Sequence, residues 1–345
     1  MLPVQLKPPR RLGKVVGVSL YLSTGLRITH VNKTGAAMLS RSTSAQPLTG
    51  VALNLCALLV LVSMAGVVKA VSAHVPTGQA VFSRAFFSLP FILGWIALQG
   101  PLMDGLRMAQ PRLHLLRGLV GSATLGMNFL ALSLLPLPEV TVIGFAAPVL
   151  TLVFAVVFLG EKVRLFRWTA VAMGLAGVMI VVWPRLSLGG TVDEMARLGA
   201  LMALGAAVCA ALVKIIVRHM VATESTPAIV FWFAVTASAL SFLTLPFGWV
   251  MPSGNVMALL VLTGALGGVG QLMMTASYRF ADASALAPFW YAQLFFASFI
   301  GYFFFGEVPT GPMIAGATLV IASGMLILWR ESQLGKKTQE RLPHS

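Results

Sequence analysis

The sequence predicts an all-α integral membrane protein with ten transmembrane helices, arranged as two inverted five-helix repeats. Of its 345 residues, 58% are hydrophobic and only 10% are charged, whereas about 25% of the residues of soluble domains are charged. So few charged side chains cannot cover a chain of this length in water, so a soluble enzyme is excluded. The other two observations are a series of long apolar runs and an internal repeat.

Ten apolar runs lie between polar or turn-rich breaks, and each approaches the roughly 20 residues that a helix needs to cross the hydrocarbon core. They are 48–71, 80–99, 115–135, 140–159, 168–183, 198–217, 227–250, 256–278, 283–305 and 308–329. The connections between them are short and leave no room for a soluble domain. Membrane-spanning strands would alternate apolar and polar residues over about ten positions. The last run shows almost no such alternation, so we expect helices.

Residues 1–47 form a basic segment before the first run. They include seven lysines and arginines and no acidic residue, and their apolar stretch, 15–26, is too short to span a membrane. No clear cleavage pattern follows that stretch, as a secretory signal would require. We therefore expect a disordered cytoplasmic extension, and translation from Met38 is an alternative. The remaining parts are a first repeat, 48–184, a second repeat, 195–330, and a cytoplasmic tail, 331–345.

Lysine and arginine are distributed unevenly between alternate loops. With a cytoplasmic N-terminus, 20 of the 24 basic residues lie in cytoplasmic segments and two in outside loops, while Lys69 and Arg84 fall within helices. Because cytoplasmic loops carry the excess of positive charge, we expect a multi-pass protein of the inner (plasma) membrane with both termini in the cytoplasm. Nucleic-acid binding would need a clustered basic face, so it is not expected.

An internal repeat relates the two halves at an offset of 146 residues. The segment 158–161 (Phe-Leu-Gly-Glu) recurs as 304–307 (Phe-Phe-Gly-Glu), and Lys69 and Lys214 align at an offset of 145. Each half then holds five helices, and an odd number inverts the second copy relative to the first. Many secondary transporters are built from inverted repeats, with the substrate site near the midplane between them.

The run 131–139, followed by 145–148 and 160–161, has a second copy that extends from 276–284 through Pro288 to 306–307. Together these motifs resemble the EamA-like family of the drug/metabolite transporter superfamily, over about residues 48–330. The resemblance implies a five-plus-five bundle that works by alternating access, with a cavity lined mainly by helices 1 to 4 and 6 to 9. Family members move amino acids, other metabolites, riboflavin or S-adenosylmethionine in either direction.

Charged residues within the runs are the first candidates for substrate binding. Arg84 is flanked by apolar residues in the second run, where a cation is costly unless it faces a cavity or a partner; snorkelling or a bond to a helix-end carbonyl is the alternative. Lys69 ends the first run and could reach the same cavity, although lysines at helix ends usually snorkel. No acidic residue lies in mid-helix to neutralise either one. Lys214, the counterpart of Lys69, is expected at the cytoplasmic end of the sixth helix as a topology determinant.

Aromatic and amide side chains complete the candidate site. The clusters 231–233 and 289–291 can stack on a planar or cationic ligand, and we favour Trp232 and Tyr291; lipid-facing placement is the alternative. Asn128 and Gln271 fall in the equivalent third and eighth helices. Either amide can bind substrate or bond to a neighbouring helix.

The repeated Gly-Glu motifs are interpreted as structural or gating elements rather than as substrate ligands. A glycine just past a helix end can adopt the left-handed conformation that closes the helix. This interpretation applies to Gly160 and Glu161 in the first half and to Gly306 and Glu307 in the second.

The function predicted from these features is a secondary transporter of a small organic metabolite. Because Arg84 and Lys69 are cationic, we expect an amino-acid-like, riboflavin-like or other anionic or neutral planar solute. Alternatives are a drug/metabolite exporter or a carrier of S-adenosylmethionine, whose sulfonium fits the cations less well. A membrane-embedded enzyme, the alternative from another class, would need paired acids or a histidine with an acid at a common depth. The expected partners are a small-molecule substrate and the lipid bilayer; a homodimer is left open, and no cofactor, metal ion or catalytic residue is expected.

Overall fold

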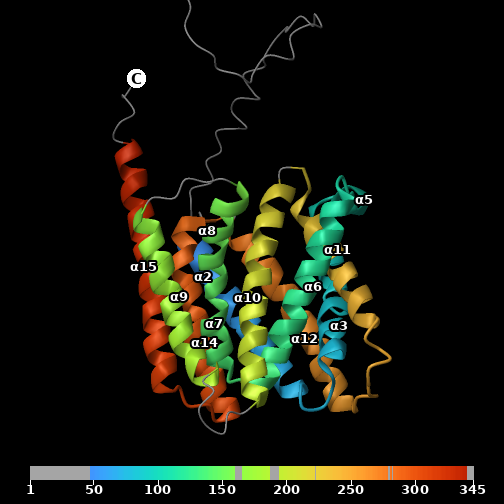
Figure 1. Ribbon diagram of the computed structural model, residues 1–345. Helices are drawn as coiled ribbons and strands as arrows, with labels where there is room; N and C mark the ends of the chain where they lie inside the picture. The colour runs from blue at the N-terminus through green and yellow to red at the C-terminus, as the bar shows by residue number, and fades with distance from the viewer. Residues whose placement is uncertain are drawn as a thin grey trace, which may run out of the picture. The chain divides into compact units, whose positions relative to one another are not determined.

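The computed structural model describes residues 47–159, 165–186, 194–221, 223–278, 280–281 and 283–339, and within these ranges it contains helices and turns and no strand (Figure 1). The predicted extension, residues 1–47, lies outside the described residues except for its last one. The helices are α2 (Pro47–Val71), α3 (Thr77–Phe86), α4 (Leu89–Gln99), α5 (Leu102–Leu106), α6 (Pro111–Leu134), α7 (Leu137–Gly144), α8 (Ala146–Leu159), α9 (Leu165–Leu186), α10 (Glu194–Met220), α11 (Thr226–Phe242), α12 (Gly254–Ser277), α13 (Ala283–Leu286), the 3-10 helix η1 (Ala287–Tyr291), α14 (Ala292–Phe305) and α15 (Gly311–Gln339).

Eight helical stretches of the described residues are long and apolar enough to cross a membrane. Two shorter apolar helices, Thr226–Phe242 and Gly311–Ile327, lie where the sequence predicts the seventh and tenth spans. The prediction of an all-α, multi-pass membrane protein is confirmed. Helix α15 continues to Gln339, beyond the predicted start of the C-terminal tail.

Three of the predicted runs are broken rather than continuous. The breaks separate α3 from α4, α7 from α8, and α13 from α14. A proline follows each break closely. The helices before the first two breaks end four residues before the proline, at Phe86 before Pro90 and at Gly144 before Pro148, and the third ends two residues before it, at Leu286 before Pro288. The proline ring clashes with the carbonyl four residues earlier and lacks an N–H donor. The helical hydrogen bonding of these runs is therefore interrupted within the bundle.

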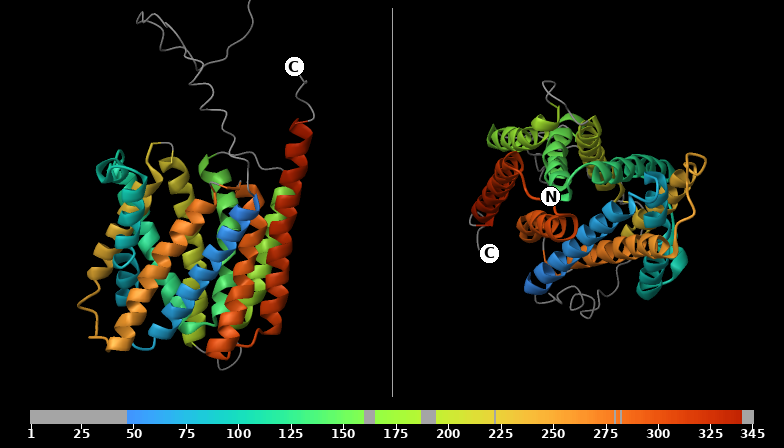
Figure 2. Two further views of the ribbon diagram at one scale, coloured as in Figure 1. Left: turned by 180° about the vertical axis from the view of Figure 1, so that it is seen from behind. Right: turned by 90° about the horizontal axis from the view of Figure 1, so that it is seen from below.

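The internal repeat appears in the helix boundaries. Adding 146 to the bounds of α8, Ala146–Leu159, gives those of α14, Ala292–Phe305, and α9 and α15 begin at Leu165 and Gly311, the same offset apart. The packing repeats as well: α2 lies along α12, and α10 lies along α6. Figure 2 shows the first of these pairs as blue and orange helices side by side. Each half thus packs its first helix against the third helix of the other half.

Helices α9 and α15 form a third close pair through small residues. A methyl group on Gly177 would lie 2.7 Å from the carbonyl oxygen of Gly316, so only glycine allows the two backbones to come this close. Nearby, the Ser323 hydroxyl donates a hydrogen bond of 2.9 Å to the carbonyl of Ala170. The remaining helices enclose the space between the halves, where the candidate site lies.

Candidate functional site

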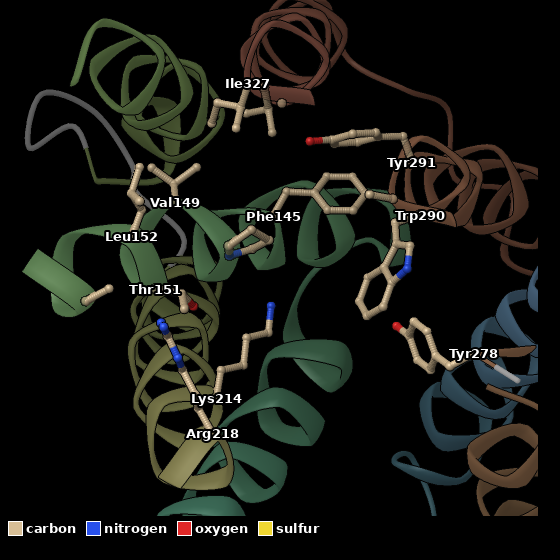
Figure 3. Close-up of a pocket in the computed structure, with 15 residues that line it drawn as sticks. Phe145, Val149, Thr151, Leu152, Lys214, Arg218, Tyr278, Trp290, Tyr291 and Ile327 are labelled. Carbon is tan, nitrogen blue, oxygen red and sulfur yellow. The ribbon is translucent and has the colours of Figure 1, made fainter. Parts of the chain in front are cut away.

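A cavity of about 440 Å³ lies between α8, α10, η1 and α15 (Figure 3). Aromatic side chains from four positions line it: Phe145, Tyr278, Trp290 and Tyr291. Lys214 and Arg218 project into it from α10, opposite Trp290 and Tyr278. Such a mixture of apolar walls and a few polar groups is typical of small-molecule sites.

A second cavity of about 300 Å³ adjoins the first, since both are lined by Phe145, Pro148, Lys214 and Trp290. It extends toward α2 and α6 and adds the amide of Asn128 to the lining. Of the predicted substrate-binding residues, Tyr291 therefore lines the first cavity and Asn128 the second. We refer to the two together as the central cavity.

Lys214, which sequence analysis treated as a topology determinant and not as a binding candidate, lines both parts of the central cavity. Its Nζ lies 5.8 Å from the centroid of the Trp290 ring, and no hydrogen bond or ion pair is recorded for it within the described ranges. It lies in the last third of α10, six residues before the helix ends at Met220. The signal that could have found it is its equivalence to Lys69. A cation in this position favours an anionic ligand.

At the end of the bundle opposite to Lys214, an ion pair joins the two halves. Lys69 Nζ lies 2.9 Å from Glu307 Oε1 and donates to the carbonyl oxygens of Leu132 and Leu135 at 3.2 and 2.6 Å. Glu307 Oε2 accepts a hydrogen bond of 2.8 Å from the backbone N–H of Leu137. The sequence has no mid-helix acid to neutralise Lys69, and its partner Glu307 comes instead from a loop that the fold brings to the end of α2.

Gly306 sets the position of Glu307. It ends α14 in the left-handed region, with φ of 66°, which glycine adopts at little cost. The N–H groups of Gly306 and Glu307 donate back to the carbonyls of Tyr302 and Gly301 at 3.1 and 3.0 Å. A methyl group on Gly301 would lie 2.7 Å from Glu307 Oε2, so this glycine leaves room for the carboxylate. The first-half counterparts, Gly160 and Glu161, lie outside the described residues.

A second ion pair lies at the same end of the bundle. Arg185 donates to both carboxylate oxygens of Glu139, at 2.8 and 3.2 Å, and joins α9 to the first turn of α7. Paired bonds from a guanidinium fix geometry more firmly than a single contact does. Arg185, predicted in an outside loop, belongs to α9.

The opposite end carries a buried pair of its own. His114 Nε2 lies 3.2 Å from Glu224 Oε2, and the N–H groups of Ala109 and Gln110 donate to Glu224 Oε1 at 2.9 and 2.5 Å. Burial raises the pKa of Glu224, but the hydrogen bonds from His114 and from the two amides outweigh it and hold this pKa below its usual range. The pair ties α6 to the turn before α11.

Arg84 and Gln271 lie away from the central cavity, in a pocket of about 60 Å³ that they share with Arg117 and Phe233. Lys69 and Arg84 do not come together, contrary to expectation. Arg117, which the sequence placed in a cytoplasmic segment, belongs to α6 and stacks on Phe233, with 4.0 Å between its guanidinium carbon and the ring centroid. That Arg84 and Gln271 bind substrate stays a prediction.

Trp232 makes a structural contact. Its indole Nε1 donates a hydrogen bond of 2.9 Å to the carbonyl of Leu106, which ties α11 to α5. The substrate-binding role predicted for it stays untested. Its neighbour in sequence, Phe233, faces the arginine pocket instead.

Comparison with known proteins supplies the family. The model of the EamA-like transporter family matches residues 48–183 and 197–329. An S-adenosylmethionine uptake transporter of Rickettsia felis is 28% identical over 76% of this chain and 86% of its own length. A riboflavin transporter of Rhizobium johnstonii is 28% identical over 76% and 84%, and the pseudopaline exporter CntI of Pseudomonas aeruginosa is 27% identical over 80% and 94%.

A solved crystal structure shares the fold, with a TM-score of 0.59 at 20% identity, over 83% of this chain and 98% of that one. The two segments matched by the family model coincide with the two halves of the bundle, each of which packs its first helix against the third helix of the other. These segments cover most of the sequence and the relatives that match it are transporters. The chain therefore belongs to the EamA-like transporter family and is a membrane transporter of a small metabolite.

Proposed function

We propose that this transporter carries a metabolite that joins a planar ring to an anionic group, such as a carboxylate or a phosphate. The observation that carries the proposal is Lys214, a cation without a recorded ion pair among the described residues, opposite aromatic side chains in the central cavity. Aromatic faces stack on planar rings, and a lysine ammonium forms strong, charge-assisted hydrogen bonds with carboxylates and phosphates.

S-adenosylmethionine has this combination, because it contains an adenine ring and a carboxylate. Its sulfonium is a cation that the face of Trp290 or Tyr278 can attract. The relatives named as S-adenosylmethionine uptake transporters support this candidate. Riboflavin offers a larger ring system but no carboxylate to pair with Lys214, so it is the second candidate, supported by the aromatic lining and by the Rhizobium relative.

Transport would proceed by alternating access between two inverted five-helix halves with ten spans, the seventh and tenth being the shorter apolar helices. With both termini in the cytoplasm, as the distribution of basic residues favours, the closed end with Lys69 and Glu307 faces outward. Lys214 and Arg218 stand near the other end of α10. We assign the described conformation to an inward-facing state, with the central cavity reached from the cytoplasm.

Uptake into membrane vesicles tests the proposal. Vesicles containing the protein should accumulate radiolabelled S-adenosylmethionine. Competition by unlabelled riboflavin then shows how well the second candidate binds relative to the first. Lys214→Met should lower uptake by roughly tenfold or more, as expected from the loss of a charged hydrogen bond, and Lys214→Arg should retain part of it. The control is Arg197→Gln, on the same helix, whose partner Glu194 is exposed. Unchanged uptake by Lys214→Met would contradict the assignment of this site.

A further inference from the structure

The pocket of about 60 Å³ around Arg84 and Arg117 lies between α3, α6, α11 and α12. None of the residues that line it lines either part of the central cavity. Metabolite sites usually measure about 300 to 1000 Å³. The pocket is therefore too small for the proposed substrate, and it has room for an ion of a few atoms.

Two positive charges meet in this pocket without a recorded counter-charge. Nε of Arg84, and Nε and Nη1 of Arg117, are buried and have no hydrogen-bond partner. Within the described ranges, neither arginine is recorded in an ion pair. Three buried or half-buried acids of these ranges are engaged elsewhere: Glu139 with Arg185, Glu224 with His114 and Glu307 with Lys69.

Arginine stays protonated in proteins, so these charges cannot be removed by losing a proton. A buried charge without a partner is strongly destabilising, and two of the same sign also repel each other. An anion between them would relieve both costs at once. The pocket thus has the charge and the unpaired donors that an anion needs.

The surroundings of the two guanidinium groups suit a small anion. Phe233 covers one face of Arg117, and stacking leaves the N–H groups free in the plane of the guanidinium. Gly267 stands beside Arg84, and a methyl group there would lie 3.1 Å from Met64 Sδ and 3.4 Å from Arg84 Nε. The amide of Gln271 lines the same pocket and can donate a further hydrogen bond.

We propose that Arg84 and Arg117 bind a small inorganic anion of chloride size, at a site separate from the substrate cavity. This site rests on the arginine pocket alone and not on the proposed substrate. Its occupant neutralises two arginines of the first half, where α3 and α6 pack against α11 of the second half. We therefore expect the anion to stabilise the folded protein even when no substrate is present.

Thermal unfolding of the purified protein in detergent tests the site without any transport assay. Chloride is titrated against gluconate at constant ionic strength, and the unfolding temperature should rise and saturate, as a ligand of the folded state requires. Arg117→Gln and Arg84→Gln should abolish the saturable rise. Arg112→Gln, on the same helix but exposed, is the matched control and should keep it.

Gly267→Ala provides a variant that keeps both arginines and narrows the pocket. It should raise the chloride concentration at half-saturation by roughly tenfold, as for the loss of one charged hydrogen bond. Equal chloride effects in the wild type and in this variant would overturn the proposal. So would a saturable rise with acetate or glycine but not with chloride, because the pocket would then belong to the substrate's carboxylate.

Discussion

Lys69 and Lys214 occupy equivalent positions in the two halves, yet the fold gives them different surroundings. Lys69 is neutralised by Glu307 and held by two backbone carbonyls, whereas Lys214 faces aromatic rings in the central cavity. Sequence alone identified Lys69 as a candidate because it stands within an apolar run. Its partner could not be found in the same way, because no spacing rule links residues 69 and 307.

The lack of a spacing rule between helices also explains why the sequence did not identify Arg117 as a pocket residue. It stands close to the start of α6 and so resembles a loop residue in a count of positive charges, but one more turn of helix carries it into the bundle beside Arg84. Arg84 and Arg117 belong to different helices. Only the packing of α3 on α6 brings them into one pocket.

Glu307→Gln tests the closure that we propose at the end of the bundle with Lys69. Glutamine keeps an acceptor for the N–H of Leu137 but loses the charge that pairs with Lys69, so the closed end should open more often. A cysteine at Thr141, which lines the central cavity, should then react several times faster with an impermeant thiol reagent added outside, as expected from losing a charged hydrogen bond. Glu194→Gln, which removes an exposed ion pair, is the control. Equal labelling rates in the two variants would argue against a gating role for Glu307.

At the scale of the helices, counting apolar residues predicts where the chain crosses the membrane but not where a helix is interrupted. The breaks before Pro90, Pro148 and Pro288 fall inside runs that are predominantly apolar. A hydropathy count treats proline as one more weakly polar residue. Its ring, however, removes a backbone hydrogen bond and clashes with the carbonyl four residues earlier in a helix. The breaks matter for function because Phe145 stands at the one between α7 and α8 and Tyr291 at the one before α14; their ring centroids lie 5.2 Å apart and both residues line the cavity.

Gly306→Ala tests the importance of the left-handed turn after α14. Alanine at φ of 66° should cost about 1 kcal/mol or somewhat more, and it should displace Glu307 from Lys69. We expect a lower unfolding temperature in detergent. Gly311→Ala is the matched control, since neither glycine has an atom within 4 Å of an added methyl group and Gly311 has an ordinary φ. Equal unfolding temperatures for the two variants would show that the turn contributes little.

For the molecule as a whole, the class, the approximate spans and the repeat follow from composition and spacing, because a lipid environment restricts the chain to helices or closed barrels and long apolar runs without alternation favour helices. The orientation rests on the distribution of positive charge. With Cys56 and Cys209 replaced, a cysteine at Met251 should react with an impermeant reagent from outside, and one at Met103 should not. Both native side chains are strongly exposed, at 98% and 79%, so a difference reports the side of the membrane. The reverse pattern would invert the assignment.

The contact between α9 and α15 has a further consequence. At an offset of 146, Ala170 corresponds to Gly316 and Gly177 to Ser323, so the approach of Gly177 to Gly316 and the bond from Ser323 to Ala170 are one contact seen from both sides. A surface that matches itself in this way is isologous, and a single five-helix chain bearing it could pair with a second copy of itself. Once a duplication joins the copies in one chain, they no longer need to stay identical. Each half is then free to diverge, as the lysine that is neutralised in one half and faces the cavity in the other illustrates.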